Sequence, residues 1–84
     1  MSERILVIED DRPLGAQIVG HLEAGGYEPA WITDGDAFRD VNVGDHCLVI
    51  LDLMLPGMTG MDILKRLREA SDVPVLILSA QRHG

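Results

Sequence analysis

The sequence is poor in several residue types, and each shortage excludes a class of protein. Its 84 residues include a single cysteine, Cys47, so an internal disulfide is excluded. No apolar run approaches the length of a membrane-spanning helix, and no signal-peptide-like apolar stretch follows the N-terminus. We therefore expect a soluble, cytoplasmic protein that does not enter membranes. Because Cys47 begins an apolar run, we expect its thiol to be buried.

Positive charge is also scarce. The chain has seven lysines and arginines against fourteen acids, which gives a formal net charge of -7. This balance argues against contact with nucleic acid or anionic membranes by this segment, and it is compatible with binding a cation. Apolar residues make up 46% of the sequence, enough for the core of one small domain and too many for a disordered chain.

Apolar runs typical of buried strands alternate with segments typical of helices. The runs cover residues 4–8, 27–32, 47–51 and 75–78. Strands that alternate with helices predict a parallel sheet with right-handed crossovers. Pro29 cannot donate a backbone hydrogen bond, so its strand should lie at an edge of the sheet.

Three helices are expected between these strands. The first should be capped by Asp10 or Asp11, with Leu14, Ile18 and Leu22 as its apolar stripe. A short, weak helix is expected over residues 36–41, and a loop is expected over residues 44–46.

The last of these helices should begin at Thr59, with Asp62 completing an approximate capping box. Its inner face is predicted to include Met61, Leu64 and Leu67, and Ile63 is a further candidate.

Oxygen-bearing side chains follow three of the four predicted strands. Glu9 and Asp10 follow the first, Asp52 the third and Ser79 the fourth. The carboxyl edge of a parallel sheet is where open α/β folds bind ligands. Carboxylates gathered there would repel one another, and Mg²⁺, which prefers oxygen ligands, would relieve that repulsion. One carboxylate could then act as a nucleophile toward a phosphoryl group and form an aspartyl phosphate.

A simpler interpretation exists for each acid taken alone. Aspartate is common where a strand meets a turn, as at Asp52. Glu9, Asp10 and Asp11 could form a solvated acidic turn that caps the following helix, because acids stabilise helix N-termini. Trp31 is interpreted as a packing residue, since aromatics near edge strands usually serve the core. The three histidines show no metal-ligand spacing.

Three stretches together resemble the receiver domain of bacterial two-component response regulators. They read ILVIEDD at 5–11, LDLMLPGMTG at 51–60 and VLILSA at 75–80. The resemblance covers the whole chain and is strongest to the branch that carries a C-terminal winged-helix DNA-binding domain. It implies a flavodoxin-like, doubly wound parallel α/β sheet. The implied fold for residues 1–84 is a single truncated receiver domain with about four strands, in the order 2-1-3-4, and three helices.

The resemblance also implies a role for each residue of the acidic cluster. Asp52 matches the phosphoacceptor that receives a phosphoryl group from a sensor histidine kinase. Glu9 and Asp10 match the acidic pair that binds Mg²⁺ together with Asp52. The backbone carbonyl of Met54 matches a further metal ligand.

Further positions match the region around the phosphoryl group. Ser79 matches the switch residue whose hydroxyl meets it, and Ala80 matches the small residue that keeps it accessible. Asp11 lies one place beyond the acidic pair and is assigned to helix capping. The family catalyses only its own phosphorylation and dephosphorylation, so we expect no other enzymatic activity, and DNA contact only through an output domain of the parent protein.

The sequence departs from the family after the fourth strand. Receiver domains continue through a helix, a fifth strand and a last helix, and the family's lysine lies in that part. The one lysine here, Lys65, stands outside the motif, so no residue takes that role. The strand 75–78 should then be an exposed apolar edge, which predicts a homo-oligomer formed through that strand or through the uncovered sheet face.

Two hypotheses of different classes remain open. The first is a Mg²⁺-dependent phosphoacceptor module of a two-component phosphorelay. The second is a truncated receiver that cannot be phosphorylated and acts only in self-association or protein interaction. A hydrolase of the haloacid-dehalogenase type is discounted, because it needs a second acid two residues after the nucleophile and Met54 stands there.

Overall fold

The computed structural model describes residues 3–53 and 59–78. Three positions with predicted roles, Met54, Ser79 and Ala80, lie outside the described residues. Within the described part of the chain, no helix has the length and apolar character needed to cross a membrane.

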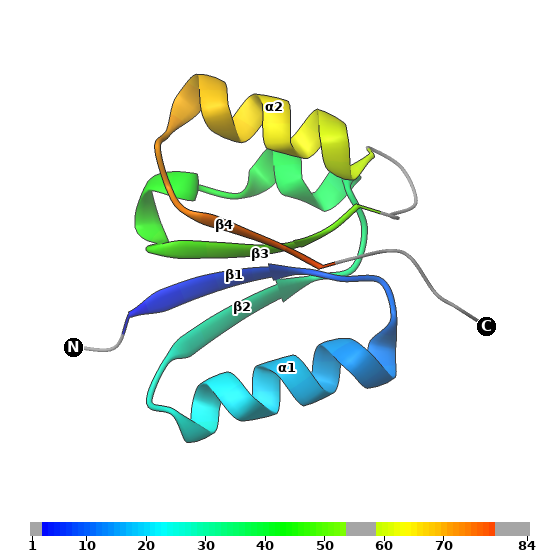
Figure 1. The fold of residues 1–84 in the computed structure, drawn as a ribbon, viewed down its shortest axis with the longest axis vertical. Helices are drawn as coiled ribbons and strands as arrows, with labels where there is room; N and C mark the ends of the chain where they lie inside the picture. The colour runs from blue at the N-terminus through cyan, green and yellow to red at the C-terminus, as the bar shows by residue number, and fades with distance from the viewer. Residues whose placement is uncertain (1–2, 54–58, 79–84) are drawn as a thin grey trace.

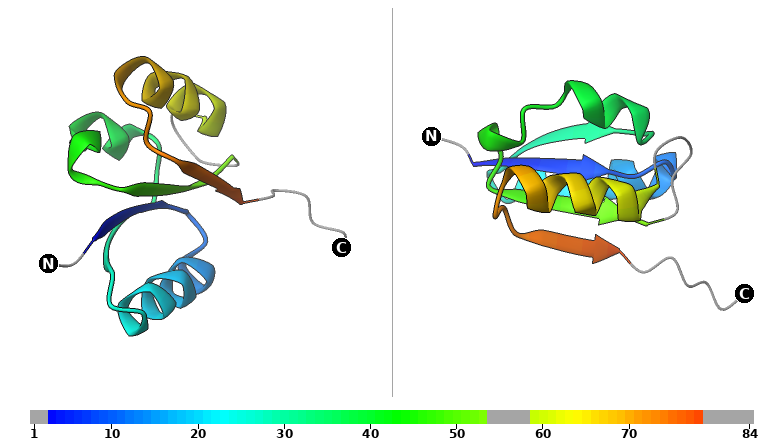
Figure 2. Two further views of the ribbon diagram at one scale, coloured as in Figure 1. Left: turned by 60° about the vertical axis from the view of Figure 1, so that its left-hand side comes forward. Right: turned by 90° about the horizontal axis from the view of Figure 1, so that it is seen from above.

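Parallel strands form one twisted sheet in the described part of the chain, in the order β2-β1-β3-β4 (Figure 1). This is the predicted strand order. Figure 2 shows the sheet between α1 on one face and α2, with two short 3-10 helices, on the other. The elements are β1 (Arg4–Ile8), α1 (Arg12–Ala24), β2 (Glu28–Ile32), η1 (Asp36–Asp40), η2 (Val43–Asp45), β3 (Leu48–Asp52), α2 (Gly60–Ala70) and β4 (Val75–Leu78).

The two central strands, β1 and β3, carry the core. Side chains alternate between the faces of a strand, so each strand contributes to both layers. On the α2 side, Leu6 and Leu51 pack with Ile63, and all three are fully buried. On the α1 side, Val7 and Ile50 form a smaller cluster. The prediction that the first apolar run forms a buried strand is confirmed, and that strand is buried on both faces.

Helix α1 begins as the sequence predicts. The Oδ1 atom of Asp11 accepts a hydrogen bond from the Leu14 amide at 3.1 Å, which satisfies one free N–H of the first turn. The helix ends at Ala24, and Gly26 then adopts a φ of 90°, a conformation that favours glycine. Pro29 lies on β2, which is an edge strand within the described sheet, as expected.

The crossover between β2 and β3 contains 3-10 helices, which are wound more tightly than an α-helix. The short helix expected over 36–41 takes the 3-10 form in η1, and the loop expected over 44–46 partly belongs to η2. Asp34 stabilises the start of η1 by accepting a hydrogen bond from the Ala37 amide at 2.9 Å. The crossover contributes Phe38 to the core, and Val41 and Val43 pack against that core.

Helix α2 is capped by Thr59, as predicted, but its inner face is rotated from the prediction. The Thr59 hydroxyl accepts a hydrogen bond from the Asp62 amide at 3.2 Å. Ile63 and Leu67 are fully buried, whereas Met61 is 59% exposed. The prediction for Met61 was wrong because Met61 lies two residues before Ile63, about 200° around the helix.

The burial predicted for Cys47 was also wrong. Strand β3 begins at Leu48, one residue later than expected, and Cys47 is exposed. Its amide donates to the carbonyl of Arg4 at 2.9 Å, so the backbone is paired while the residue remains exposed to solvent. The first residue of an apolar run can lie just outside the strand, where it is exposed to solvent. Hydrophobicity alone does not predict that exposure.

Two glycines in helices test how tightly α2 is packed against β3. A Cβ atom at Gly60 would lie 2.8 Å from the Asp52 carbonyl oxygen and would overlap the Cα of Leu53. A Cβ atom at Gly20, in α1, would meet nothing within 4 Å. We predict that Gly60→Ala destabilises the protein by about 1–3 kcal/mol, because helix and strand must separate. Gly20→Ala should stabilise it by about 0.5–1 kcal/mol.

Urea denaturation followed by circular dichroism measures both changes. Gly20→Ala is the matched control, because the same substitution is made in a helix without a neighbouring backbone. Equal stability changes in the two variants would contradict the close contact between α2 and β3.

Candidate functional site

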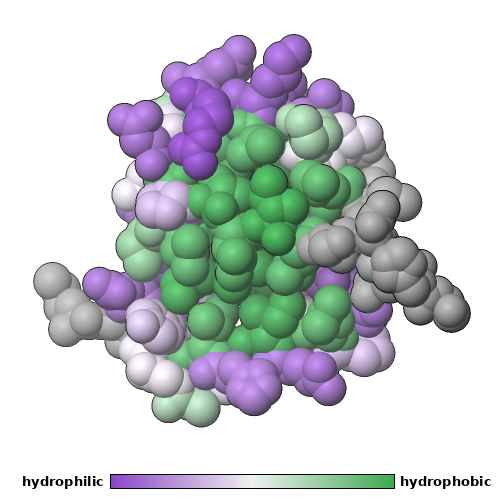
Figure 3. All heavy atoms as spheres, viewed as in Figure 1, coloured by the Kyte–Doolittle hydropathy of each residue, from purple (hydrophilic) through white to green (hydrophobic). Residues whose placement is uncertain are grey.

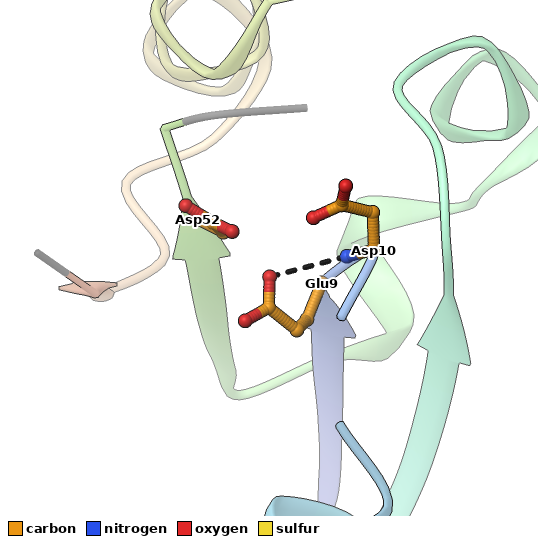
Figure 4. A group of neighbouring side chains, drawn as sticks. All are labelled: Glu9, Asp10 and Asp52. Carbon is orange, nitrogen blue, oxygen red and sulfur yellow. Dashed lines mark hydrogen bonds between the residues drawn. The ribbon is translucent and has the colours of Figure 1, made fainter. Parts of the chain in front are cut away.

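The register of the sheet brings the predicted acids together. Ile8 of β1 pairs with Leu51 of β3, so the next residues along each strand, Glu9 and Asp52, lie side by side. Figure 4 shows the carboxylates of Glu9, Asp10 and Asp52 directed toward one another at the carboxyl ends of β1 and β3. Residues far apart in the sequence thus form one acidic cluster.

Glu9 is the deepest member of this cluster. Its residue is fully buried, and its Oε2 atom accepts a hydrogen bond from the Asp10 amide at 3.1 Å. Its Oε1 atom is buried and has no hydrogen-bond partner among the described residues. A buried carboxylate oxygen without a donor is costly, and a cation bound beside it would remove that cost.

The donor set suits a hard divalent cation. Glu9, Asp10 and Asp52 can each offer one carboxylate oxygen, and these atoms lie within 4.8 Å of one another. Mg²⁺ needs one or two carboxylates and otherwise keeps its waters. Glu9 and Asp52 are buried whereas Asp10 is exposed, so the cluster is reached from solvent on the Asp10 side.

The environment favours the protonated form of Glu9. Burial, together with a side-chain hydrogen bond to Asp52 and the charge of Asp52, raises the pKa of Glu9 from 4.5 to about 8. The charge of Asp10 acts in the same direction, and a backbone hydrogen bond from Asp11 lowers the pKa. A cation that binds the cluster must therefore displace a proton from it near neutral pH.

The backbone of Glu9 is held by β2. Its amide donates to the carbonyl of Ile32 at 3.1 Å, and its carbonyl accepts a hydrogen bond from the indole Nε1 of Trp31 at 2.9 Å. The sequence analysis interpreted Trp31 as packing alone and missed this contact.

Among the described residues, Asp11 and Lys65 are not part of this cluster. Asp11 caps α1, as expected. Lys65 lies on the exposed side of α2 and lines a surface pocket with Arg39, Arg66 and two acids, away from the carboxylates.

The raised pKa of Glu9 predicts how stability depends on pH. Between pH 4.5 and about 8 the folded chain keeps a proton that the unfolded chain releases, so the free energy of unfolding should fall as pH rises. The slope for one proton is at most about 1.4 kcal/mol per pH unit. Urea denaturation of the metal-free chain across this range measures it.

Glu9→Gln should flatten this slope, because glutamine does not titrate. Glu23→Gln, an exposed glutamate on α1, is the matched control and should leave the slope in place. A slope in Glu9→Gln equal to that of the unmodified chain would show that another group is responsible.

Comparison with known proteins agrees with this geometry. Residues 5–83 match the response regulator receiver domain family. The transcriptional regulator BaeR of Escherichia coli O6:H1 is 37% identical over 95% of this chain, and the DNA-binding response regulator MtrA of Mycobacterium tuberculosis is 43% identical over 96%. The chain spans about a third of the length of these relatives, 34% and 36% respectively.

Solved structures show the same fold. The non-phosphorylated HemR receiver domain of Leptospira biflexa superposes with a TM-score of 0.85 and 33% identity, over 99% of this chain and 68% of that one. The BeF3-activated receiver domain of Klebsiella pneumoniae RstA superposes with a TM-score of 0.86 and 30% identity, over 95% of this chain and 69% of that one. With sheet order, acidic cluster and sequence in agreement, this chain belongs to the response regulator receiver domain family.

Proposed function

We propose that this chain accepts a phosphoryl group on Asp52 in a two-component phosphorelay. The observation that carries the proposal is the convergence of Glu9, Asp10 and Asp52, with ligand oxygens within 4.8 Å, at the carboxyl edge of a parallel sheet. The membership of the chain in the receiver family supports it. In this proposal, residues 1–84 form one receiver unit.

Glu9, Asp10 and Asp52 would hold Mg²⁺, with the backbone carbonyl of Met54 as a further proposed ligand. Bound Mg²⁺ would neutralise charge on the cluster and on the incoming phosphoryl oxygens. The unpartnered Oε1 of Glu9 supports this assignment, because it is a buried acceptor without a donor. Deprotonation of Glu9 would accompany binding of the cation.

Asp52 would act as the nucleophile. One oxygen of its carboxylate forms a bond to phosphorus while the bond from phosphorus to the histidine nitrogen of a sensor kinase breaks. The electron pair of the broken bond returns to the imidazole, which takes a proton from solvent. Ser79 would donate a hydrogen bond to the phosphoryl oxygens, and Ala80 would leave space for them.

The module would work in the cytoplasm and catalyse no reaction besides its own phosphorylation and dephosphorylation. MtrA is a DNA-binding response regulator by its name. With a net charge of -7, these 84 residues are unsuited to DNA. Any DNA contact of a longer protein would therefore use residues outside this segment.

The proposed phosphorylation should change the mass of the chain in a way that depends on Asp52 and on Mg²⁺. After incubation with Mg²⁺ and a small acyl phosphate, the intact mass of the chain should rise by one phosphoryl group. Asp52→Asn should show no increase, because its amide cannot act as the nucleophile, and omission of Mg²⁺ should strongly reduce the increase.

Asp62→Asn is a matched control, because Asp62 is an exposed acid on α2 away from the cluster. It should be phosphorylated like the unmodified chain. No mass increase in a folded, unmodified sample would favour the alternative, an association module that cannot be phosphorylated.

We further propose that the chain self-associates through β4. Its pairing with β3 is the one ladder that β4 makes among the described residues, and it contains no charged side chain. Leu76 is 53% exposed and Ile77 is 43% exposed. Figure 3 shows that apolar side chains dominate the surface on this side of the molecule. Open apolar edge strands favour pairing with another chain.

Lysine on β4 should weaken this association. Sedimentation equilibrium of the unmodified chain should show a mass that increases with concentration, and Leu76→Lys or Ile77→Lys should shift the transition to higher concentration. Tyr27→Lys is the control, since Tyr27 is 42% exposed and lies outside β4. A monomer at all concentrations in the unmodified chain would contradict the proposal.

A further inference from the structure

Trp31 links three elements at the end of the sheet that carries the acidic cluster. It lies on β2, paired in register with Val7 of β1. Its indole ring fits against Gly15 of α1, where an added Cβ would overlap the ring and lie 2.9 Å from Nε1. Gly15 is buried, although the rest of α1 is half-buried or exposed. The helix therefore has a notch that receives the indole.

The indole reaches the acidic cluster through one peptide group. The carbonyl of Glu9 and the amide of Asp10 belong to the same planar unit. Trp31 donates to that carbonyl at 2.9 Å, and the amide donates to the Glu9 carboxylate at 3.1 Å. The plane is thus fixed at both of its polar ends.

Fixing this plane orients the Glu9 carboxylate and sets the position of the Asp10 Cα atom. The Cα atom of Asp10 lies in the plane, so rotation of the plane would displace the Asp10 side chain. The same rotation would remove the hydrogen bond that orients the Glu9 carboxylate. The amide of Glu9, which donates to Ile32 at 3.1 Å, anchors the preceding peptide to the same strand.

We propose that Trp31 is a positioning residue that preorganises Glu9 and Asp10 for binding a divalent cation. The inference rests on the proposed function, because the cation is Mg²⁺ in that proposal. Among side chains of this size and apolar character, tryptophan carries an N–H donor that phenylalanine and leucine lack. The notch at Gly15 holds the donor in place, and a rigid first shell binds a metal more tightly than a mobile one.

Replacement of the indole N–H tests the proposal directly. The chain contains one tryptophan, so biosynthetic incorporation of benzothienylalanine, in which sulfur replaces the N–H, changes this position alone. Trp31→Phe removes the same donor by mutation. Isothermal titration with MgCl₂ should give a dissociation constant about threefold to tenfold weaker in both, the value expected for one lost hydrogen bond.

The notch offers a second, independent variant. Gly15→Ala leaves every hydrogen-bonding group in place but displaces the indole, so it should also weaken Mg²⁺ binding. Gly20→Ala is the matched control in the same helix, with nothing within 4 Å of the added atom, and should bind Mg²⁺ like the unmodified chain. Circular dichroism establishes that each sample is folded.

The outcomes separate this inference from the proposed function. If Trp31 has only a structural role, its replacement should lower the free energy of unfolding and leave the dissociation constant for Mg²⁺ unchanged. That result would overturn the inference alone. Absence of Mg²⁺ binding in the unmodified chain would overturn the proposed function and the inference with it.

A measurement on the unmodified chain covers the case in which the variants do not fold. The single indole N–H gives one resonance in a ¹⁵N correlation spectrum. It should be protected from exchange with solvent and should shift during a MgCl₂ titration with the same dissociation constant as calorimetry. An exchanging indole that does not respond to Mg²⁺ would overturn the inference.

Discussion

Mutual repulsion among carboxylates is the constraint on which the arrangement of this chain depends. Two unit charges 4 Å apart interact by about 4 kcal/mol at an effective dielectric constant of 20. The fold nevertheless holds three carboxylates within 4.8 Å and buries two of them. The raised pKa of Glu9 shows how the cost is reduced without a cation: the cluster keeps a proton.

The two central strands compensate for this cost. Leu6, Ile8 and Val49 are fully buried, as are several of their neighbours in the same core. Each such side chain contributes about 1.5–3 kcal/mol on burial. Two or three of them offset the repulsion within one carboxylate pair. The cluster therefore lies at the ends of the most buried strands, β1 and β3, rather than on the half-exposed edge strands.

The sequence predicts whatever depends on periodicity and strand order. Glu9 and Asp52 each follow a buried apolar run, and a parallel sheet brings such ends to one edge, so their meeting is predictable. The face of α2 is not, because Met61 and Ile63 both fit an apolar stripe and packing against β3 decides between them. The hydrogen bond from Trp31 to Glu9 depends on the pairing of β2 with β1 and on the notch at Gly15 of α1, which no local pattern encodes.

The pairing of Ile8 with Leu51 has a consequence for folding. These residues are far apart in the sequence, and the chain between them must cross over twice before they can meet. Non-local parallel pairing of this kind is slow compared with local helix formation. The acidic cluster therefore does not exist in a partly folded chain, whatever helices it has formed. A nascent or misfolded chain therefore lacks the arrangement of carboxylates, since that arrangement exists only once β1 and β3 have paired.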